Sequence, residues 1–274
     1  MAASNLTVRI GTAIVAVPAI LALLYLGPAW GFYILIAAAA CVGAFELFAM
    51  THPKDRVAQL LGVLTTLAVS LCLFFLSDDP RVLMSVIVVT PLLGLLIPLW
   101  RLGEMQTVAL RVAVGGFGPL YVGGCLTTLA LLRKDHPNPT AGGLVVLALA
   151  LAWLSDTGGY FAGRFLGKHK LYEAVSPKKT IEGSVGGMLA ALAGAIIAHF
   201  WFLPTLPLVH GIVLALVASF LGQMGDLGES LIKRATGVKD SGAIVPGHGG
   251  ILDRVDALMV TSTAVYLYTR WFVV

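Results

Sequence analysis

The sequence predicts an all-α, polytopic integral membrane protein with about nine transmembrane helices. Of its 274 residues, 58% are hydrophobic and 12% are charged, whereas about a quarter of the residues are charged in ordinary soluble domains. The mean hydropathy is +0.92, and apolar stretches recur along the whole chain. This composition excludes a disordered chain and a small disulfide-bonded module, and it argues strongly against a soluble enzyme.

Nine apolar segments have the length of about 20 residues that a helix needs to cross a bilayer core. Prolines such as Pro28, Pro53, Pro80 and Pro137 lie between them. The first segment is long for a signal peptide and lacks a clean cleavage site, so we expect it to be retained as a span. The three cysteines lie inside apolar segments and are expected to be packing residues. The expected spans are 9–26, 29–50, 57–76, 82–100, 109–132, 141–163, 184–202, 206–224 and 252–273.

The distribution of basic residues predicts the orientation of these spans. With nine spans, 14 basic residues fall on one side and 4 on the other. The positive-inside rule then places the N-terminus in the cytoplasm and the C-terminus outside. The net charge of +4 is therefore attributed to cytoplasmic loops rather than to nucleic-acid binding. The four residues on the outer side are Arg81, Arg133, Lys134 and Arg270.

We expect a single membrane domain, 1–274, with two unlike parts. Residues 1–140 form plain spans with short loops, whereas residues 141–274 contain the long, polar, glycine-rich connections. No internal repeat of the kind found in transporters is evident. The sequence therefore places the polar chemistry in the C-terminal half, on the cytoplasmic side.

Two polar clusters in this half are candidates for substrate binding. Asp156 lies at the cytoplasmic end of the sixth span, where a carboxylate is costly unless it is paired or hydrated. It is a functional candidate, although a helix cap or a pair with Arg164 would also explain it. The next loop contains Ser176, Pro177, Lys178, Lys179 and Thr180 just before a helix start. Two ammonium groups beside a helix N-terminus suit a phosphate, or equally a nonspecific contact with lipid headgroups.

The densest polar cluster runs from Asp226 to Asp256. On a helix, Asp226, Ser230 and Lys233 share one face because they lie at i, i+4 and i+7. A loop with Lys239 follows. Beyond it, a glycine-rich segment allows a backbone to approach a ligand closely. That segment contains His248, which is either a metal ligand or base or a loop hydrogen-bonder, together with Gly249; Asp253, Arg254 and Asp256 then begin the last span.

Asp226, Asp253 and Asp256 are hard oxygen ligands at the membrane edge. Such carboxylates suit Mg²⁺, which takes one or two of them and completes its coordination with water and phosphate oxygens. Each aspartate could instead be an ion-pair partner or a helix cap. The sequence lacks the Walker A and Rossmann glycine motifs, so a bound nucleotide must be held by this metal and loop arrangement.

At these residues the chain resembles a known family. The stretch from Ser230 to Asp256, with Lys233, Lys239 and Asp253 in place, is similar to the signature of the phosphatidate cytidylyltransferases, also called CDP-diacylglycerol synthases. The strings at 155–164 and 176–183 also resemble the family. The resemblance spans about residues 150–258, and the N-terminal spans share only its hydrophobic pattern.

The resemblance implies that CTP and phosphatidate react to give CDP-diacylglycerol and pyrophosphate, with Mg²⁺ and a second, monovalent cation such as K⁺. It implies a helical, homodimeric enzyme of the inner membrane whose site faces the cytoplasm. Asp226 and Asp253, with Asp256 nearby, match the metal-site positions, and Ser230, Lys233 and Lys239 match polar positions of that site. The expected substrate-binding residues are Asp156, Ser176, Lys178, Lys179, Thr180, His248, Gly249 and Arg254.

Two alternative functions predict different sequence patterns. A CDP-alcohol phosphotransferase would carry later aspartates four residues apart, whereas Asp253 and Asp256 are three apart. A secondary transporter should show repeated halves and charges in the middle of several spans. Only Glu46 lies deep in an early span, where it could equally be a structural hydrogen-bonding residue. Release of pyrophosphate that depends on both substrates would separate the enzyme from the transporter.

Overall fold

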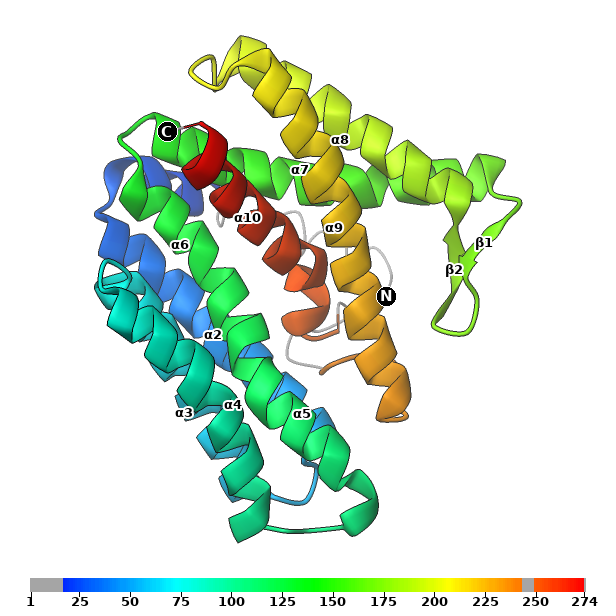
Figure 1. Cartoon of the computed structure of the whole chain (residues 1–274). Helices are drawn as coiled ribbons and strands as arrows, with labels where there is room; N and C mark the ends of the chain where they lie inside the picture. The colour runs from blue at the N-terminus through cyan, green and yellow to red at the C-terminus, as the bar shows by residue number, and fades with distance from the viewer. Residues whose placement is uncertain (1–16, 243–248, 274) are drawn as a thin grey trace.

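The computed structural model describes residues 17–242 and 249–273, which form helices and one short hairpin (Figure 1). The elements that follow a first apolar helix, Val17–Leu26, are α2 (Ala29–Thr51), α3 (Arg56–Leu76), α4 (Pro80–Trp100), η1 (Met105–Thr107), α5 (Val108–Pro119), η2 (Leu120–Gly124), α6 (Cys125–Asp135), α7 (Thr140–Leu166), β1 (Lys170–Tyr172), β2 (Ser176–Thr180), α8 (Ile181–Trp201), α9 (Leu208–Ala235) and α10 (Leu252–Phe272).

Among the described residues, seven helical stretches are long and apolar enough to cross a membrane. They coincide with the second to eighth predicted spans, so the structure agrees with an all-α polytopic membrane protein. The ninth predicted span corresponds to α10, which is less apolar because Asp253, Arg254 and Asp256 occupy its first turns. The first predicted span is described only over Val17–Leu26.

The fifth span is one continuous helical stretch, Met105–Asp135, with an irregular centre. It changes from α5 into the five-residue π-helix η2 directly after Pro119. Proline has no N–H to donate and its ring displaces the preceding carbonyl, so the helix widens here. The irregular turn is buried against α3: a Cβ on Gly123 would lie 2.6 Å from the Thr66 carbonyl oxygen.

Helices α2 to α6 lie beside one another, and α10 runs between α6 and α9 (Figure 1). Helices α7 and α8 pack along each other over most of their length. Small residues allow this close approach, because a Cβ on Gly158 would lie 2.5 Å from the Ala190 Cβ. The pairing brings the C-terminal end of α7 next to the N-terminal end of α8. The β1–β2 hairpin that connects them projects from this point (Figure 1).

Buried hydroxyl groups connect several of the helices. The Ser70 Oγ lies 3.2 Å from the Tyr33 hydroxyl and 2.7 Å from the Thr127 Oγ1, which links α2, α3 and α6. Thr128 donates to Ser262 across 3.1 Å and so links α6 to α10. In an apolar environment such groups need partners within the protein, so these contacts favour one arrangement of the helices.

The sequence predicts only a polar loop where the structure has the β1–β2 hairpin. Its two strands are antiparallel, with Lys170 opposite Thr180 and Tyr172 opposite Ser176. Thr180 then begins α8, since its Oγ1 accepts a hydrogen bond of 3.1 Å from the Gly183 N–H. The prediction that Thr180 lies at a helix start is confirmed, and the strand holds the two lysines before it in an extended conformation.

Candidate active site

A cavity of about 380 Å³ lies where α7, α8, α9 and the hairpin meet. Five of the predicted site residues line it, although they come from three separate stretches of sequence. Asp156 comes from α7, Asp226 comes from α9, and the hairpin contributes Lys178, Lys179 and Thr180. The structure therefore joins the two predicted substrate-binding clusters and the start of the Asp226 cluster into one site.

An ion pair crosses this cavity. The Lys179 Nζ lies 2.6 Å from the Asp226 Oδ2, and each side chain is about one quarter exposed. Lys178, the neighbouring strand residue, is exposed but lines the same cavity. One lysine is thus fixed against a carboxylate while the other remains accessible, and both present ammonium groups to anything that enters.

The base of the hairpin is fixed by Glu182 in the first turn of α8. Its Oε2 accepts hydrogen bonds from the backbone N–H groups of Lys168 and His169, at 3.1 and 3.2 Å. Its Oε1 lies 2.7 Å from the His169 ring. These contacts tie the chain leaving α7 to the start of α8, so the strand that carries the two lysines has little freedom at its base.

Sequence reasoning missed a polar network in the wall of the cavity. The Gln223 Nε2 donates to the Ser155 Oγ and to the Ser184 carbonyl, each at 3.2 Å, and its Oε1 accepts from the Ser184 Oγ. The Ser155 Oγ lies 2.8 Å from the Ser219 Oγ. These contacts join α7, α8 and α9 next to Asp156 and Asp226. A glutamine inside an apolar span was the signal that could have revealed the network.

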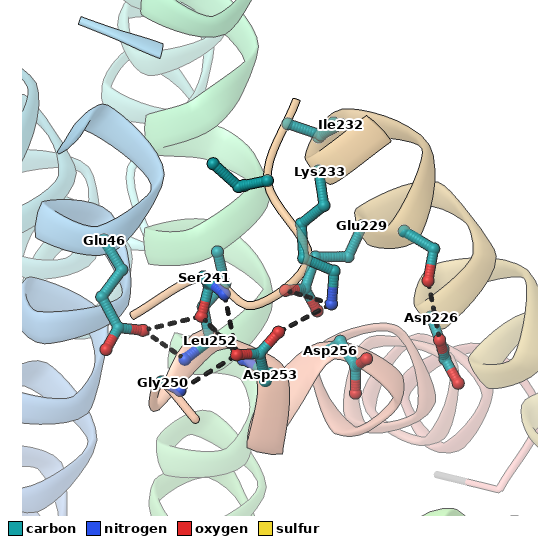
Figure 2. Close-up of polar contacts among 12 residues, drawn as sticks. Glu46, Asp226, Glu229, Ile232, Lys233, Ser241, Gly250, Leu252, Asp253 and Asp256 are labelled. Carbon is teal, nitrogen blue, oxygen red and sulfur yellow. Dashed lines mark hydrogen bonds and ion pairs between the residues drawn. The ribbon is translucent and has the colours of Figure 1, made fainter. Parts of the chain in front are cut away.

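A second cluster surrounds Asp253 at the start of α10 (Figure 2). The Asp253 Oδ1 accepts a hydrogen bond of 2.6 Å from the Lys233 ammonium group. Its Oδ2 accepts from the N–H groups of Ser241 and Gly250, at 2.8 and 2.9 Å, and from the Ser241 hydroxyl at 2.9 Å. The carboxylate is therefore held on both oxygens by residues from α9 and from both ends of the connection that follows it.

Three further carboxylates lie beside this cluster. Figure 2 shows Asp256 between Asp253 and Asp226, and Asp256 is close enough to Asp226 and Glu229 for the charges to interact. Glu229 is fully buried, and it is close enough to Asp256 and Lys233 to interact with both. Its Oε1 lies 3.2 Å from the Lys233 Nζ. Asp226 thus belongs to both the cavity and the cluster of acidic residues.

The remaining predicted residues lie outside the cavity or at its edge. The Ser230 Oγ is 3.5 Å from the Asp226 Oδ1, as their shared helix face predicts. Gly249 has a φ of +81°, which favours glycine, and a Cβ there would lie 2.9 Å from the Asp253 Oδ2. His248 lies outside the described residues. Ser176, Lys239 and Arg254 do not line the cavity in the described part of the chain, and the last two are exposed.

A larger cavity of about 710 Å³ lies near the ends of α2, α4 and α9, and none of the predicted site residues lines it. Its charged side chains pair with one another: Asp55 lies 2.9 Å from Arg101 and 3.5 Å from Arg111. Burial raises the pKa of Asp55, but hydrogen bonds from Arg101 and the Ala58 N–H, and the charge of both arginines, bring it below its ordinary value. We interpret these pairs as contacts that connect helices rather than as a site of chemistry.

Comparison with known proteins decides the family. A sequence model described as the cytidylyltransferase family matches residues 7–272, which is nearly the whole chain. The chain belongs to this cytidylyltransferase family. A phosphatidate cytidylyltransferase of Synechocystis sp. is 32% identical over 96% of each chain.

Two other relatives, also named phosphatidate cytidylyltransferase, match shorter parts of the chain. A phosphatidate cytidylyltransferase of Brucella suis is 40% identical over 65% of this chain and 62% of its own length. One of Staphylococcus haemolyticus is 48% identical over 42% of this chain and 44% of its own length. The match thus covers about three fifths of the Brucella protein.

The donor set of this cytidylyltransferase-family protein fits a cation with oxygen ligands. Asp226, Glu229, Asp253 and Asp256 supply four carboxylates, whereas Lys179 and Lys233 supply two ammonium groups. In the described residues no three His, Cys, Asp or Glu side chains are arranged so that they could hold a metal ion. Metal binding by Asp226, Asp253 and Asp256 therefore stays a prediction.

Proposed function

We propose that this protein is a phosphatidate cytidylyltransferase, which transfers CMP from CTP to phosphatidate and releases pyrophosphate. The observation that carries the proposal is the convergence of Lys178, Lys179, Asp156 and Asp226 on one cavity, in a chain whose family match extends over nearly its whole length. The cavity lies at the C-terminal end of α7 and the N-terminal end of α8, beside the middle of α9. A substrate with acyl tails in the bilayer and a phosphate at its edge suits that position.

The reaction needs positive charge more than it needs a base. A phosphate oxygen of phosphatidate attacks the α-phosphorus of CTP, and the bond to the bridging oxygen of the β-phosphate breaks to release pyrophosphate. The attacking phosphate is already ionised at neutral pH. The barrier comes from bringing two polyanions together and from charge that develops on the leaving group. Lys178 and Lys179 are placed to bind phosphate oxygens and to reduce that repulsion.

Asp226, Asp253 and Asp256 are the proposed Mg²⁺ ligands, and K⁺ is the proposed second cation. When bound, Mg²⁺ supplies the charge that neutralises the triphosphate and the leaving pyrophosphate. Mg²⁺ commonly takes only one or two protein carboxylates, with substrate oxygens completing the set. Asp226 is positioned for this role because it faces the cavity and also adjoins Asp256. Lys233 holds Asp253 from the other side.

Purified protein in mixed vesicles of phosphatidate and a neutral lipid tests the proposed reaction. We expect pyrophosphate release only when CTP, phosphatidate and Mg²⁺ are all present, with loss on adding a chelator and recovery with excess Mg²⁺. The control replaces phosphatidate with diacylglycerol, which lacks the attacking phosphate. Folded protein that releases no pyrophosphate but consumes CDP-diacylglycerol when an alcohol is supplied would favour a CDP-alcohol phosphotransferase instead.

We propose nine spans, with the N-terminus and the candidate site in the cytoplasm and the C-terminus outside. Two of the four basic residues on the outer side have structural partners that explain their exception to the charge bias. Arg133 donates to the Leu24 and Gly27 carbonyls, at 2.7 and 3.0 Å, and Lys134 donates to the Phe74 carbonyl at 2.7 Å. Both side chains donate to carbonyl groups near the C-terminal ends of helices, where cations are favourable.

Reporter fusions test this topology. A periplasmic reporter fused after Lys134, and another at the C-terminus, should both be active, whereas a fusion in the hairpin after Glu173 should be active only with a cytoplasmic reporter. A cytoplasmic signal at the C-terminus would remove one of the nine helices.

We propose that the protein lies in the inner membrane as a homodimer, and the same cells serve to locate it. Chemical crosslinking in native vesicles should then give a band at twice the monomer mass.

A further inference from the structure

Glu46 is a buried carboxylate of α2 that faces the start of α10 (Figure 2). Only 2% of the residue is exposed. Its Oε2 accepts a hydrogen bond of 2.8 Å from the Leu252 N–H, and its Oε1 accepts one of 3.0 Å from the Ile251 N–H. These partners lie more than 200 residues away in the sequence. Glu46 therefore contacts the segment that carries the acidic cluster, although it belongs to the N-terminal half of the chain.

These contacts cap α10 from a different helix. The first N–H groups of a helix have no partner within that helix and need an external acceptor. Ile251 directly precedes the first residue of α10, and its side chain makes no capping hydrogen bond to the helix. A carboxylate at this end is also favoured by the helix dipole. Glu46 thus fixes where α10 begins, and the position of its first turn determines where Asp253 lies.

Ser241 connects Glu46 to Asp253 directly. The Ser241 Oγ lies 3.1 Å from the Glu46 Oε2 and 2.9 Å from the Asp253 Oδ2. A hydroxyl has one proton, so it can donate to only one of the two carboxylates at a time. Two glycines admit the Glu46 carboxylate at this point. A Cβ on Gly242 would lie 2.6 Å from the Glu46 Oε1, and one on Gly250 would overlap the Glu46 Oε2.

We propose that Glu46 is a positioning residue for the reaction, because it holds both Ser241 and the first turn of α10 and thereby sets the location of Asp253. This inference rests on the proposed cytidylyltransferase function. Glu46 does not line the cavity, so its effect reaches the site through Asp253 and Lys233. The described N-terminal spans would then contribute one defined group to the chemistry of the C-terminal half.

The test compares Glu46→Gln with a matched control, Ser70→Ala. The amide keeps the size of the side chain but replaces one acceptor oxygen with a donor that opposes a backbone N–H. We expect kcat to fall about 10- to 100-fold, as is typical when a residue that orients a site is lost, with little change in the KM for CTP. Ser70→Ala removes the buried hydroxyl between Tyr33 and Thr127. It should lower thermal stability but leave kcat and KM unchanged.

Hydrogen exchange provides a readout that does not depend on activity. The Ile251 and Leu252 amides should exchange faster in Glu46→Gln than in the wild type and in Ser70→Ala. If these amides exchange faster in Glu46→Gln but the wild-type protein releases no pyrophosphate, the proposed function is contradicted and the cap is not. Unchanged exchange and unchanged kcat in Glu46→Gln would overturn the positioning role, as would equal losses of kcat in both variants.

Ser241→Ala keeps the proposal testable if Glu46→Gln does not fold. It removes the bridging hydroxyl but leaves the Ser241 N–H that donates to Asp253. In Ser241→Ala alone we expect a smaller loss of kcat than in Glu46→Gln. Where Glu46→Gln folds, the double variant should lose less than the product of the two single losses, because both changes act on the same contact. Unchanged kcat in Ser241→Ala, or fully multiplicative losses in the double variant, would overturn the connection between Glu46 and Asp253.

Discussion

Replacing Asp253 with asparagine is expected to remove most Mg²⁺-dependent turnover, with a loss on the order of 100-fold or more. Asp253 accepts hydrogen bonds on both oxygens, from Lys233 on one and from Ser241 and Gly250 on the other. An asparagine has one acceptor oxygen, so its NH₂ group must face either an ammonium group or two backbone N–H groups. The substitution therefore removes a charge and disturbs the start of α10 together. Asp226→Asn should have an effect of similar size.

The measurement is pyrophosphate release by purified Asp253→Asn across a Mg²⁺ titration, with thermal unfolding in detergent to check the fold. The matched control is Asp240→Asn, the same change at an exposed position beside Ser241. The control should keep the wild-type rate and Mg²⁺ midpoint. A wild-type rate at the wild-type midpoint in Asp253→Asn would remove this residue from the metal site.

Replacing Lys179 with alanine is expected to cost more activity than the same change at Lys178. Lys179 pairs with Asp226 inside the cavity, so its loss leaves that carboxylate without its ammonium partner and close to Asp156. We expect kcat/KM to fall about 100-fold in Lys179→Ala, with both constants affected. Lys178 is exposed on the cavity wall, so Lys178→Ala should mainly raise the KM for CTP or phosphatidate, by about 10-fold.

Steady-state kinetics with each substrate varied in turn separate these outcomes. Lys168→Ala is the control, because Lys168 is an exposed lysine that does not line the cavity. It reports any general effect of lost basic charge on binding to anionic vesicles. If all three variants keep wild-type kinetics, the lysines of the hairpin form only a basic patch that faces lipid headgroups.

The membrane-crossing helices could be predicted closely because burial in a bilayer is a local property of each segment. The second to eighth predicted spans coincide with the seven apolar helices of the described structure. Boundaries were less accurate where polar residues continue a helix. The eighth span was expected to end at residue 224, but α9 continues to Ala235. Asp226, Ser230 and Lys233 are therefore on one helix, which continues beyond the apolar segment.

Their partners could not be predicted in the same way. Asp226 and Lys233 share one helix face, yet Asp226 pairs with Lys179 of the hairpin and Lys233 pairs with Asp253 of α10. The spacing of residues along a helix fixes their direction around its axis, but it does not identify which other element lies on that side. The hairpin itself was missed because β2 consists of four polar or charged residues and one proline, which have no alternating hydrophobic pattern.

The sequence by itself determined the class of the protein, the approximate limits of the seven apolar helices found in the described residues, and the residues that match a family motif. Hydropathy and short motifs depend on residues that are near one another in the chain. Only the tertiary structure decided that Asp156, Lys179 and Asp226 share a cavity, and that Glu46 caps α10 from α2. Such contacts depend on how rigid helices cross. A buried carboxylate in a span indicates that hydrogen-bond donors must lie near it, but only the packed helices show which donors these are.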